Sequence, residues 1–170
     1  MGEEATKGVG DVNSDAKGSG ARYNSGKTAY ELLPLQLVLD WLADLGADSD
    51  HPAHELLHHM GRWQAGEDDA LDDALATVID PRLGLPAFAS AVRVFEYGRR
   101  KYAAWNWAKG MPWSVPLGCI VRHALAWIGG EVFDPESGEP HRGHILCNLI
   151  MLKLYAEMYP EGDDRPKGWL

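Results

Sequence analysis

A few carboxylates and histidines in the second half of the sequence have the types and spacing of a reactive site. Glu131 and Asp134 follow an apolar helical pattern, and His141 and His144 come soon after them. Glu96 stands earlier, in a segment that is otherwise apolar and basic. Carboxylates combined with water and phosphate oxygens are the surroundings that Mg²⁺ prefers, and a bound ion activates water and polarises a phosphoryl group. The pattern favours a metal and phosphate site, and its alternatives are an ion pair within one helix and an acidic surface turn.

Basic and aromatic side chains lie close to these acids in the sequence. Arg99, Arg100 and Lys101 are consecutive, so at least one of them faces the same side as Glu96. Lys109 and Arg122 add positive charge, which would neutralise the charge that develops on phosphates. Three residues of the central loop offer either a stacking platform for a nucleobase or packing of the loop onto the helices: Trp105, Asn106 and Trp107.

A second group of histidines has the spacing of a zinc peptidase. His54, Glu55 and His58 form an H-E-x-x-H sequence, which on a helix places both histidines on one face with Glu55 as a general base. Gln64 stands where related peptidases have a third histidine, and Gln is a poor zinc ligand. A solvent-facing or capping histidine cluster is the simpler interpretation, and peptidase chemistry stays an alternative.

Apolar residues recur with a helical period along most of the chain. We therefore predict an all-α bundle of about six helices, with a disordered arm over residues 1–21, one domain over 22–159 and a loose tail over 160–170. The expected helices begin near Pro34, Pro52, Asp68, Pro86, Pro116 and His141.

Charge and composition exclude several classes of function. The formal charge is −9, but residues 1–85 carry −10 and residues 86–170 carry +1. An acidic chain is a poor partner for nucleic-acid polymers, and no apolar run is long enough to span a membrane. The first residues lack the apolar core of a secretory signal, and both cysteines lie in apolar patterns, so we expect a cytoplasmic protein with reduced thiols.

Taken together, the motifs resemble the phage dATP/dGTP diphosphohydrolase family, which is similar to the all-α, MazG-like nucleoside triphosphate pyrophosphohydrolases. The resemblance covers Arg22 to Pro34 and Val92 to Tyr155. It depends on these segments: Arg22–Lys27, Leu32–Pro34, Phe95–Tyr102, Asn106–Trp107, Lys109–Gly110, Arg122–His123, Trp127, Gly130–Glu131, Asp134–Gly138, His141, His144 and Asn148.

The resemblance implies hydrolysis of dGTP and dATP to the monophosphate and pyrophosphate, which would adjust the nucleotide pool, in the host cytoplasm if the chain is phage-encoded. Mg²⁺ or Mn²⁺ would assist, and Glu96, Glu131 and Asp134 match the metal-binding acids. Arg99 stands where the MazG-type Glu-x-x-Glu has its second acid, so His144, Glu67 or Glu55 could complete the ligand set.

On this hypothesis one of the three acids or His144 positions the water. The expected substrate-binding residues are Asn24, Lys27, Lys101, Trp107, Lys109, Arg122, His123 and Asn148. Similar bundles complete their sites across subunits, so we expect a homo-oligomer. A different hypothesis is a non-enzymatic helical module in which the tryptophans and the acidic first half form a surface for a partner.

Overall fold

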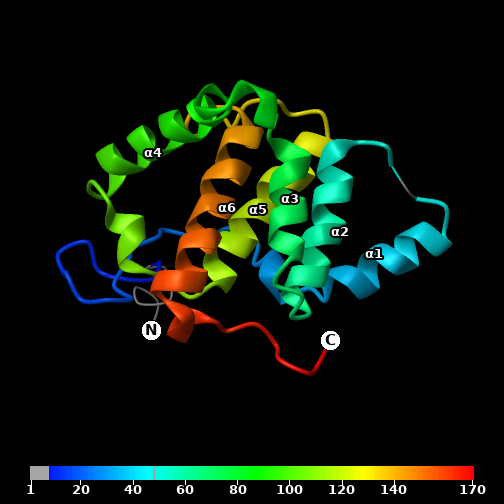
Figure 1. The fold of residues 1–170 in the computed structure, drawn as a ribbon, viewed down its shortest axis with the longest axis horizontal. Coiled ribbons are helices and arrows are strands. Elements are labelled where there is room, and N and C mark those ends of the chain that lie inside the picture. The colour runs from blue at the N-terminus through cyan, green and yellow to red at the C-terminus, as the bar shows by residue number, and fades with distance from the viewer. Residues whose placement is uncertain (1–7, 48) are drawn as a thin grey trace.

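The computed structural model describes residues 8–47 and 49–170. In this part of the chain it contains six α-helices and short 3-10 segments, with no strand longer than an isolated bridge (Figure 1). The prediction of an all-helical fold with six helices is therefore confirmed. The α-helices are α1 (Leu35–Asp44), α2 (Pro52–Gln64), α3 (Ala70–Val78), α4 (Ala89–Lys101), α5 (Ser114–Ile128) and α6 (His141–Met158).

Helices α5 and α6 form the centre of the bundle. In Figure 1, α4 lies along one side of α6, whereas α3 and α2 lie on the other side and α1 is outermost. The core comes from apolar side chains such as Leu56 of α2, Ile120 of α5 and Leu149 of α6, all fully buried. Removing this apolar surface from water is the main favourable term of the fold. It also holds α4, α5 and α6 in the relative positions that the site requires.

The N-terminal segment differs from the expected disordered arm. Residues 1–7 lie outside the described residues, but residues 8–21 are folded against the short 3-10 helix η5 (Asn106–Lys109). Val9 forms an antiparallel bridge with Arg22, and Gly20 donates to the carbonyl of Gly110 at 2.9 Å. A Cβ on Gly20 would lie 2.6 Å from that same oxygen, so only glycine fits there.

Asn106 attaches this segment to the body of the protein. Its amide oxygen accepts from the backbone N–H of Ala21 at 3.0 Å, and its amide nitrogen donates to the Ala21 carbonyl at 2.8 Å. Asn106 and Ala21 are both buried. Paired hydrogen bonds of this kind satisfy buried backbone groups as a strand would. These hydrogen bonds fix the backbone next to Arg22, whose side chain lines the cavity described below.

The C-terminal segment is also more ordered than the predicted loose tail. The Arg165 guanidinium lies over the rings of Trp63 and Trp113, 4.7 and 5.0 Å from their centroids. It also forms an ion pair with Asp163 at 2.9 Å and donates to the carbonyl of Trp63. This clasp of Arg165, Trp63, Trp113 and Asp163 joins α2, the start of α5 and the chain end.

Candidate functional site

A cavity of about 570 Å³ lies between α4, the η5 loop, α5 and α6. Residues 21–24 and Lys27 form part of its wall, so the folded N-terminal segment helps to enclose it. The cavity is lined by histidine and carboxylate side chains, by cations, and by aromatic rings from three separate parts of the sequence. A concave site with a few convergent polar groups is the usual form of a small-molecule site.

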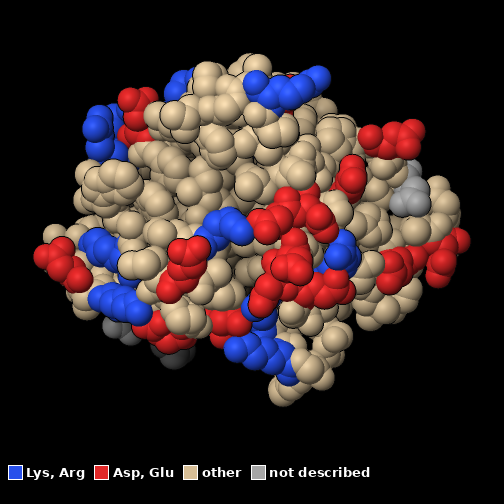
Figure 2. All heavy atoms as spheres, in the orientation of Figure 1, with Lys and Arg blue, Asp and Glu red and all other residues tan. Residues whose placement is uncertain are grey.

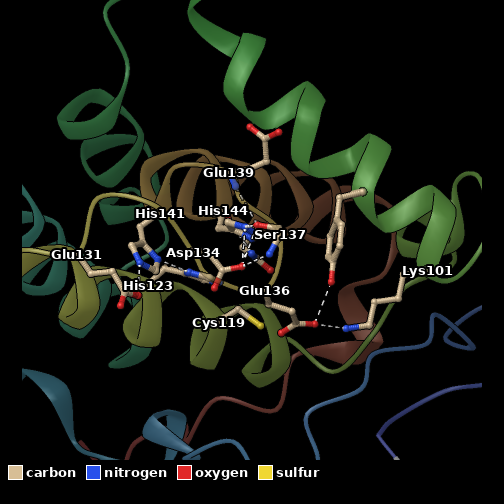
Figure 3. A network of polar contacts seen from close by, with 12 residues as sticks. Lys101, Cys119, His123, Glu131, Asp134, Glu136, Ser137, Glu139, His141 and His144 are labelled. Atoms are coloured by element: carbon tan, nitrogen blue, oxygen red, sulfur yellow. Dashed lines mark hydrogen bonds and ion pairs between the residues drawn. The ribbon is translucent and has the colours of Figure 1, made fainter.

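A histidine and carboxylate cluster forms where α5, the following turn and α6 meet (Figure 3). Ligand atoms of His123, Asp134 and His141 all lie within 4.8 Å of one another, and the two histidine Nδ1 atoms are 2.8 Å apart. On its other side, His141 contacts Glu131 with 2.8 Å between Nε2 and Oε1. In the described part of the chain, no other group of this kind is present. We call these four residues the His–Asp cluster.

The turn before α6 holds Asp134 in place. The backbone N–H and hydroxyl of Ser137 both donate to Asp134 Oδ2, at 2.9 and 2.8 Å. Asp, Ser and Gly are common at turns because they form such local hydrogen bonds and tolerate unusual backbone angles, and Gly138 follows with a φ of +75°. Ser137 Oγ also lies 2.7 Å from His144 Nε2. Since the hydroxyl proton goes to the carboxylate, His144 is the donor to Ser137.

Burial keeps two of the histidines uncharged. It lowers the pKa of His123 to about 2, and the nearby rings of His144 and His141 lower it further. Burial also lowers the pKa of His144 to about 4, although the Asp134 carboxylate opposes that shift. The two rings are stacked, with centroids 4.2 Å apart. Near neutral pH both imidazoles therefore have a lone pair that can accept a proton or bind a metal ion.

Arg22 was not among the site residues predicted from the sequence, but the structure places it in the cavity wall. Its guanidinium donates to Asn148 Oδ1 at 3.1 Å and contacts two sulfur atoms, those of Cys119 and Met151. It lines the cavity, and no acidic side chain in the described residues pairs with it. A partly buried cation without a carboxylate partner is costly unless an anion occupies the site. In the sequence, Arg22 stood out only as the first residue of the Arg22–Lys27 segment, which is part of the family resemblance.

The other cations of the cavity divide into two types. Lys27 and Lys101 both form ion pairs with Glu136, and these contacts lower the pKa of that carboxyl to about 2. Arg122 instead donates to Cys119 Sγ at 3.0 Å, and no described carboxylate pairs with it. Arg22 and Arg122 therefore contact the same sulfur. Arg99 also lines the cavity without a described ion pair, but it is exposed, so Arg22 and Arg122 are the two partly buried cations that remain available to an incoming anion.

Aromatic rings form another part of the cavity wall. Phe95 and Trp107 are stacked with centroids 4.8 Å apart, and Tyr23 and Tyr102 lie 5.4 Å apart. Trp105 is 72% exposed at the rim. It is also the one non-glycine residue with positive φ, at 61°, in the described part of the chain. Strained backbone persists where the surrounding structure enforces it, often at functional sites.

The structure brings together most, but not all, of the predicted site residues. The cavity wall includes Glu96, Asp134, His144, Asn24, Lys27, Lys101, Trp107, Arg122 and His123. Lys109 instead donates to the carbonyls of Val12 and Ser14, and Asn148 lies behind the wall, where it supports Arg22 and donates to the His144 carbonyl.

The three acids expected to bind a metal do not converge. Glu96 is exposed on α4, and its ligand atoms do not join those of Asp134 and Glu131 in one group. Glu131 contacts His141 from the side away from Asp134 (Figure 3). An all-carboxylate site for Mg²⁺ at these positions therefore does not fit the arrangement of the side chains, whereas two imidazoles and one carboxylate do converge.

The H-E-x-x-H sequence lies on α2, as predicted. The rings of His54 and His58 are 5.1 Å apart, and Glu55 is exposed, with His59 at 3.7 Å. No third ligand joins these histidines in residues 8–47 and 49–170. Gln64 is buried and holds the start of α1: it accepts from Leu35 N at 3.0 Å and donates to the carbonyls of Glu31 and Leu33.

The acidic first half of the chain forms a surface away from the cavity. Figure 2 shows acidic side chains gathered over the region of α3. Asp68, Asp72 and Asp73 are more than half exposed there and form ion pairs with Arg165, Lys153 and Arg62. The excess negative charge is thus separated from the basic and histidine-rich cavity. No helix in the described residues has both the length and the apolar character needed to cross a bilayer.

Comparison with known proteins gives one match. The family model described as dATP/dGTP diphosphohydrolase, N-terminal, matches residues 74–165, slightly more than half of the chain. No curated protein and no solved structure shows a significant match. The matched segment contains α4, α5, α6, the η5 loop and the whole His–Asp cluster. The chain belongs to the dATP/dGTP diphosphohydrolase family.

Proposed function

We propose that this protein hydrolyses purine deoxynucleoside triphosphates between the α- and β-phosphates, which releases the monophosphate and pyrophosphate and adjusts the nucleotide pool. One observation carries the proposal beyond the family name. A single cavity combines aromatic rings, two partly buried cations without described carboxylate partners, and His123 and Asp134 of the His–Asp cluster. A nucleoside triphosphate offers the complementary groups, namely a flat base, a highly charged chain of phosphates and an electrophilic phosphorus.

The two arginines are suited to hold the phosphates. Arg22 and Arg122 both contact Cys119 Sγ, so their guanidinium groups lie near each other beneath the cavity. Guanidinium groups bind phosphate oxygens with paired hydrogen bonds, and positive charge stabilises the negative charge that develops during phosphoryl transfer. Lys27 and Lys101 are held by Glu136 at the same wall and would approach the outer phosphates.

The aromatic wall is suited to bind the base. Tyr23 and Tyr102, or Trp105 and Trp107, would stack on it, because aromatic faces bind nucleobases. Asn24 Oδ1 is buried at this wall without a hydrogen-bond partner. An amino group of adenine or guanine would donate to that oxygen, which would satisfy it. This contact would favour bases that have an exocyclic amine.

His144 and Asp134 are suited to orient the attacking water. His144 is uncharged near neutral pH, and its ring is held by Ser137 and by stacking on His123. Family resemblance implies a divalent cation, and His123, Asp134 and His141 are the side chains that converge to hold one. Such an ion would supply charge stabilisation at the phosphate oxygens and lower the pKa of a bound water.

A substrate panel tests the proposal. Each dNTP and NTP is incubated with the protein and MgCl₂, MnCl₂ or CoCl₂, and the products are separated by anion-exchange chromatography. We expect dGTP and dATP to give the monophosphate and pyrophosphate. Release of inorganic triphosphate would show a different cleavage position, and intact nucleotides under every condition would contradict the proposal.

We also propose that the chain forms a homo-oligomer. Helix α1 packs on α2 through Leu35 and Leu39, but Leu37 and Trp41 on its other face and Leu45 just after its end are 46%, 57% and 81% exposed. Large apolar side chains gathered on one surface often mark a protein contact. Light scattering coupled to size-exclusion chromatography measures the mass, and a monomer at high protein concentration would contradict this proposal.

A further inference from the structure

We propose that His123, Asp134 and His141 form a binding site for a first-row transition-metal ion such as Zn²⁺ or Co²⁺, with Glu131 as the residue that orients His141. The inference deepens the proposed function by naming the ion and its ligands. It concerns binding by the chain itself and holds without any nucleotide.

The geometry of the two histidines fits one ion. Their Nδ1 atoms are 2.8 Å apart and Asp134 offers an oxygen within 4.8 Å of both. Metal–nitrogen bonds are about 2.1 Å long, so two nitrogens bound to one tetrahedral ion lie about 3.4 Å apart. The present contact is a hydrogen bond between the two Nδ1 atoms, so metal binding needs the rings to separate by roughly half an ångström and the shared proton to move to the other nitrogen of its ring. Asp134 is already held by Ser137, which leaves its second oxygen for a ligand.

Glu131 is placed as an outer carboxylate and not as a ligand. Its Oε1 lies 2.8 Å from His141 Nε2, and a carboxylate can only accept there. An uncharged His141 ring must then carry its proton on Nε2, which leaves a lone pair on Nδ1, the atom that faces His123. Histidine ligands of metal ions usually donate their other N–H to such a carboxylate, which fixes the tautomer and the ring orientation. His141 is also buried, so the ring has little freedom to leave.

The kinds of donor atom indicate the kind of ion. Imidazole nitrogens favour Zn²⁺, Fe²⁺, Co²⁺ and Ni²⁺, whereas Mg²⁺ prefers oxygen ligands and keeps its water. Two imidazoles with one carboxylate leave coordination positions for water or a substrate oxygen. The cluster borders the cavity, through His123 and Asp134, on the same wall as Arg122. An ion here would therefore lie next to the cations that bind an anion.

Metal titration of the chelator-treated full-length protein tests the site. Calorimetry with CoCl₂, ZnCl₂ and MgCl₂, in the absence of nucleotide, should show one Co²⁺ or Zn²⁺ per chain, bound at least about 100-fold more tightly than Mg²⁺. Visible absorption of bound Co²⁺ gives a second signal that is independent of activity. Absence of Co²⁺ and Zn²⁺ binding, or equal affinity for Mg²⁺, would overturn the inference.

Matched variants locate the ion. His123→Ala and Asp134→Asn should each weaken Co²⁺ binding by about 100-fold or more, and Glu131→Gln by about 10-fold to 100-fold with the stoichiometry unchanged. His59→Ala, from the histidines of α2, is the control and should bind normally. Loss of binding in His58→Ala but not in His123→Ala would place the ion on α2 and refute the proposed site.

Nuclear magnetic resonance of the wild-type protein avoids any effect of the variants on folding. In protein with ¹⁵N-labelled histidine, Zn²⁺ should shift the ring nitrogens of His123 and His141 at one equivalent and leave those of His58 and His59 in place. The opposite pattern would contradict the inference. Because no nucleotide is present, failure here is distinct from failure of the hydrolysis assay: an active enzyme that binds only Mg²⁺ would refute the site alone.

Discussion

The seven histidines of this protein form two groups with different surroundings. His51 caps α2 and His54, His58 and His59 lie on it, whereas His123, His141 and His144 come from α5 and α6. The first group has the more familiar sequence motif. In the second group, however, a turn between two helices adds Asp134, and a cavity lies alongside.

The difference shows what makes histidines into a site. On α2, neighbouring turns of one helix place two rings together, but the position of a third ligand is occupied by Gln64, which holds backbone groups of the α1 start. In the His–Asp cluster, three elements each contribute a different group. A metal or catalytic site needs groups from several directions, which one helix face cannot supply.

The largest expected effect is on the rate of dGTP hydrolysis, and we expect it from a change in the His–Asp cluster but not from a change on α2. Asp134→Asn should lower kcat for dGTP hydrolysis by about 100-fold or more, because it removes the negative charge that we propose binds a cation and orients water. Glu55→Gln should change the rate by less than about twofold. Initial rates of pyrophosphate release measure both. An inactive Glu55→Gln protein with an active Asp134→Asn protein would reverse the comparison.

The second-largest expected effect concerns Arg22, a cation of the cavity that lies beside the second group of histidines. Arg22→Met should raise KM for dGTP by about 10-fold to 100-fold, because a phosphate loses a charge-assisted hydrogen bond. The free energy of unfolding should change by no more than about 1–2 kcal/mol, since a partly buried charge is replaced by an apolar chain of similar length. Steady-state kinetics and urea unfolding measure the two effects.

Lys153→Met is the matched control for Arg22→Met. Lys153 pairs with Asp72 on the surface of α6 and α3, away from the cavity. Its replacement should leave both KM and stability nearly unchanged. If Arg22→Met unfolds the protein without a change of KM in the folded fraction, Arg22 acts only in stability.

A third effect tests the role assigned to Gln64 beside the first group. Gln64→Leu should lower the free energy of unfolding by about 2–3 kcal/mol, because Leu35 N–H and the carbonyls of Glu31 and Leu33 lose their partner. The specific activity of the folded protein should stay within about twofold of the wild type. Urea unfolding at constant pH measures the loss, and an unchanged midpoint would contradict the assignment.

The smallest effect concerns the clasp that joins the two regions. Burial opposes ionisation of Asp163, but hydrogen bonds and charge from Arg165 and Lys167 outweigh it and lower the pKa from 3.8 to about 2. A lowered pKa in the folded state stabilises the protein above the unfolded value, and this stability is lost as the pH falls toward 2.

Asp163→Asn should therefore lower stability by about 1–2 kcal/mol near pH 7 and by much less near pH 2. Guanidinium unfolding at several pH values measures the difference. Glu161→Gln is the control, because Glu161 forms an exposed ion pair with Lys17 and should contribute little. A constant difference between wild type and Asp163→Asn across the pH range would contradict the pKa assignment.

Much of the fold follows from local pattern. Pro52 and Gly66 bracket α2, and α6 begins at His141, because proline suits a first turn and glycine suits the residue after a helix. Residues 8–21 were predicted to be disordered because they contain few apolar side chains. They are folded because Asn106, far along the chain, supplies hydrogen bonds that composition does not reveal.

In the candidate site, too, some features follow from the local sequence and others depend on contacts between distant residues. The sequence by itself indicated the family and a set of site residues, most of which lie in the cavity wall, since residue types and their order are local information. Only the tertiary structure decided which groups meet. It placed Glu96 apart from Asp134, turned Glu131 toward His141, and brought Arg22 to Asn148 on the last helix. Those contacts depend on how α4, α5 and α6 pack, and packing is set by the whole core.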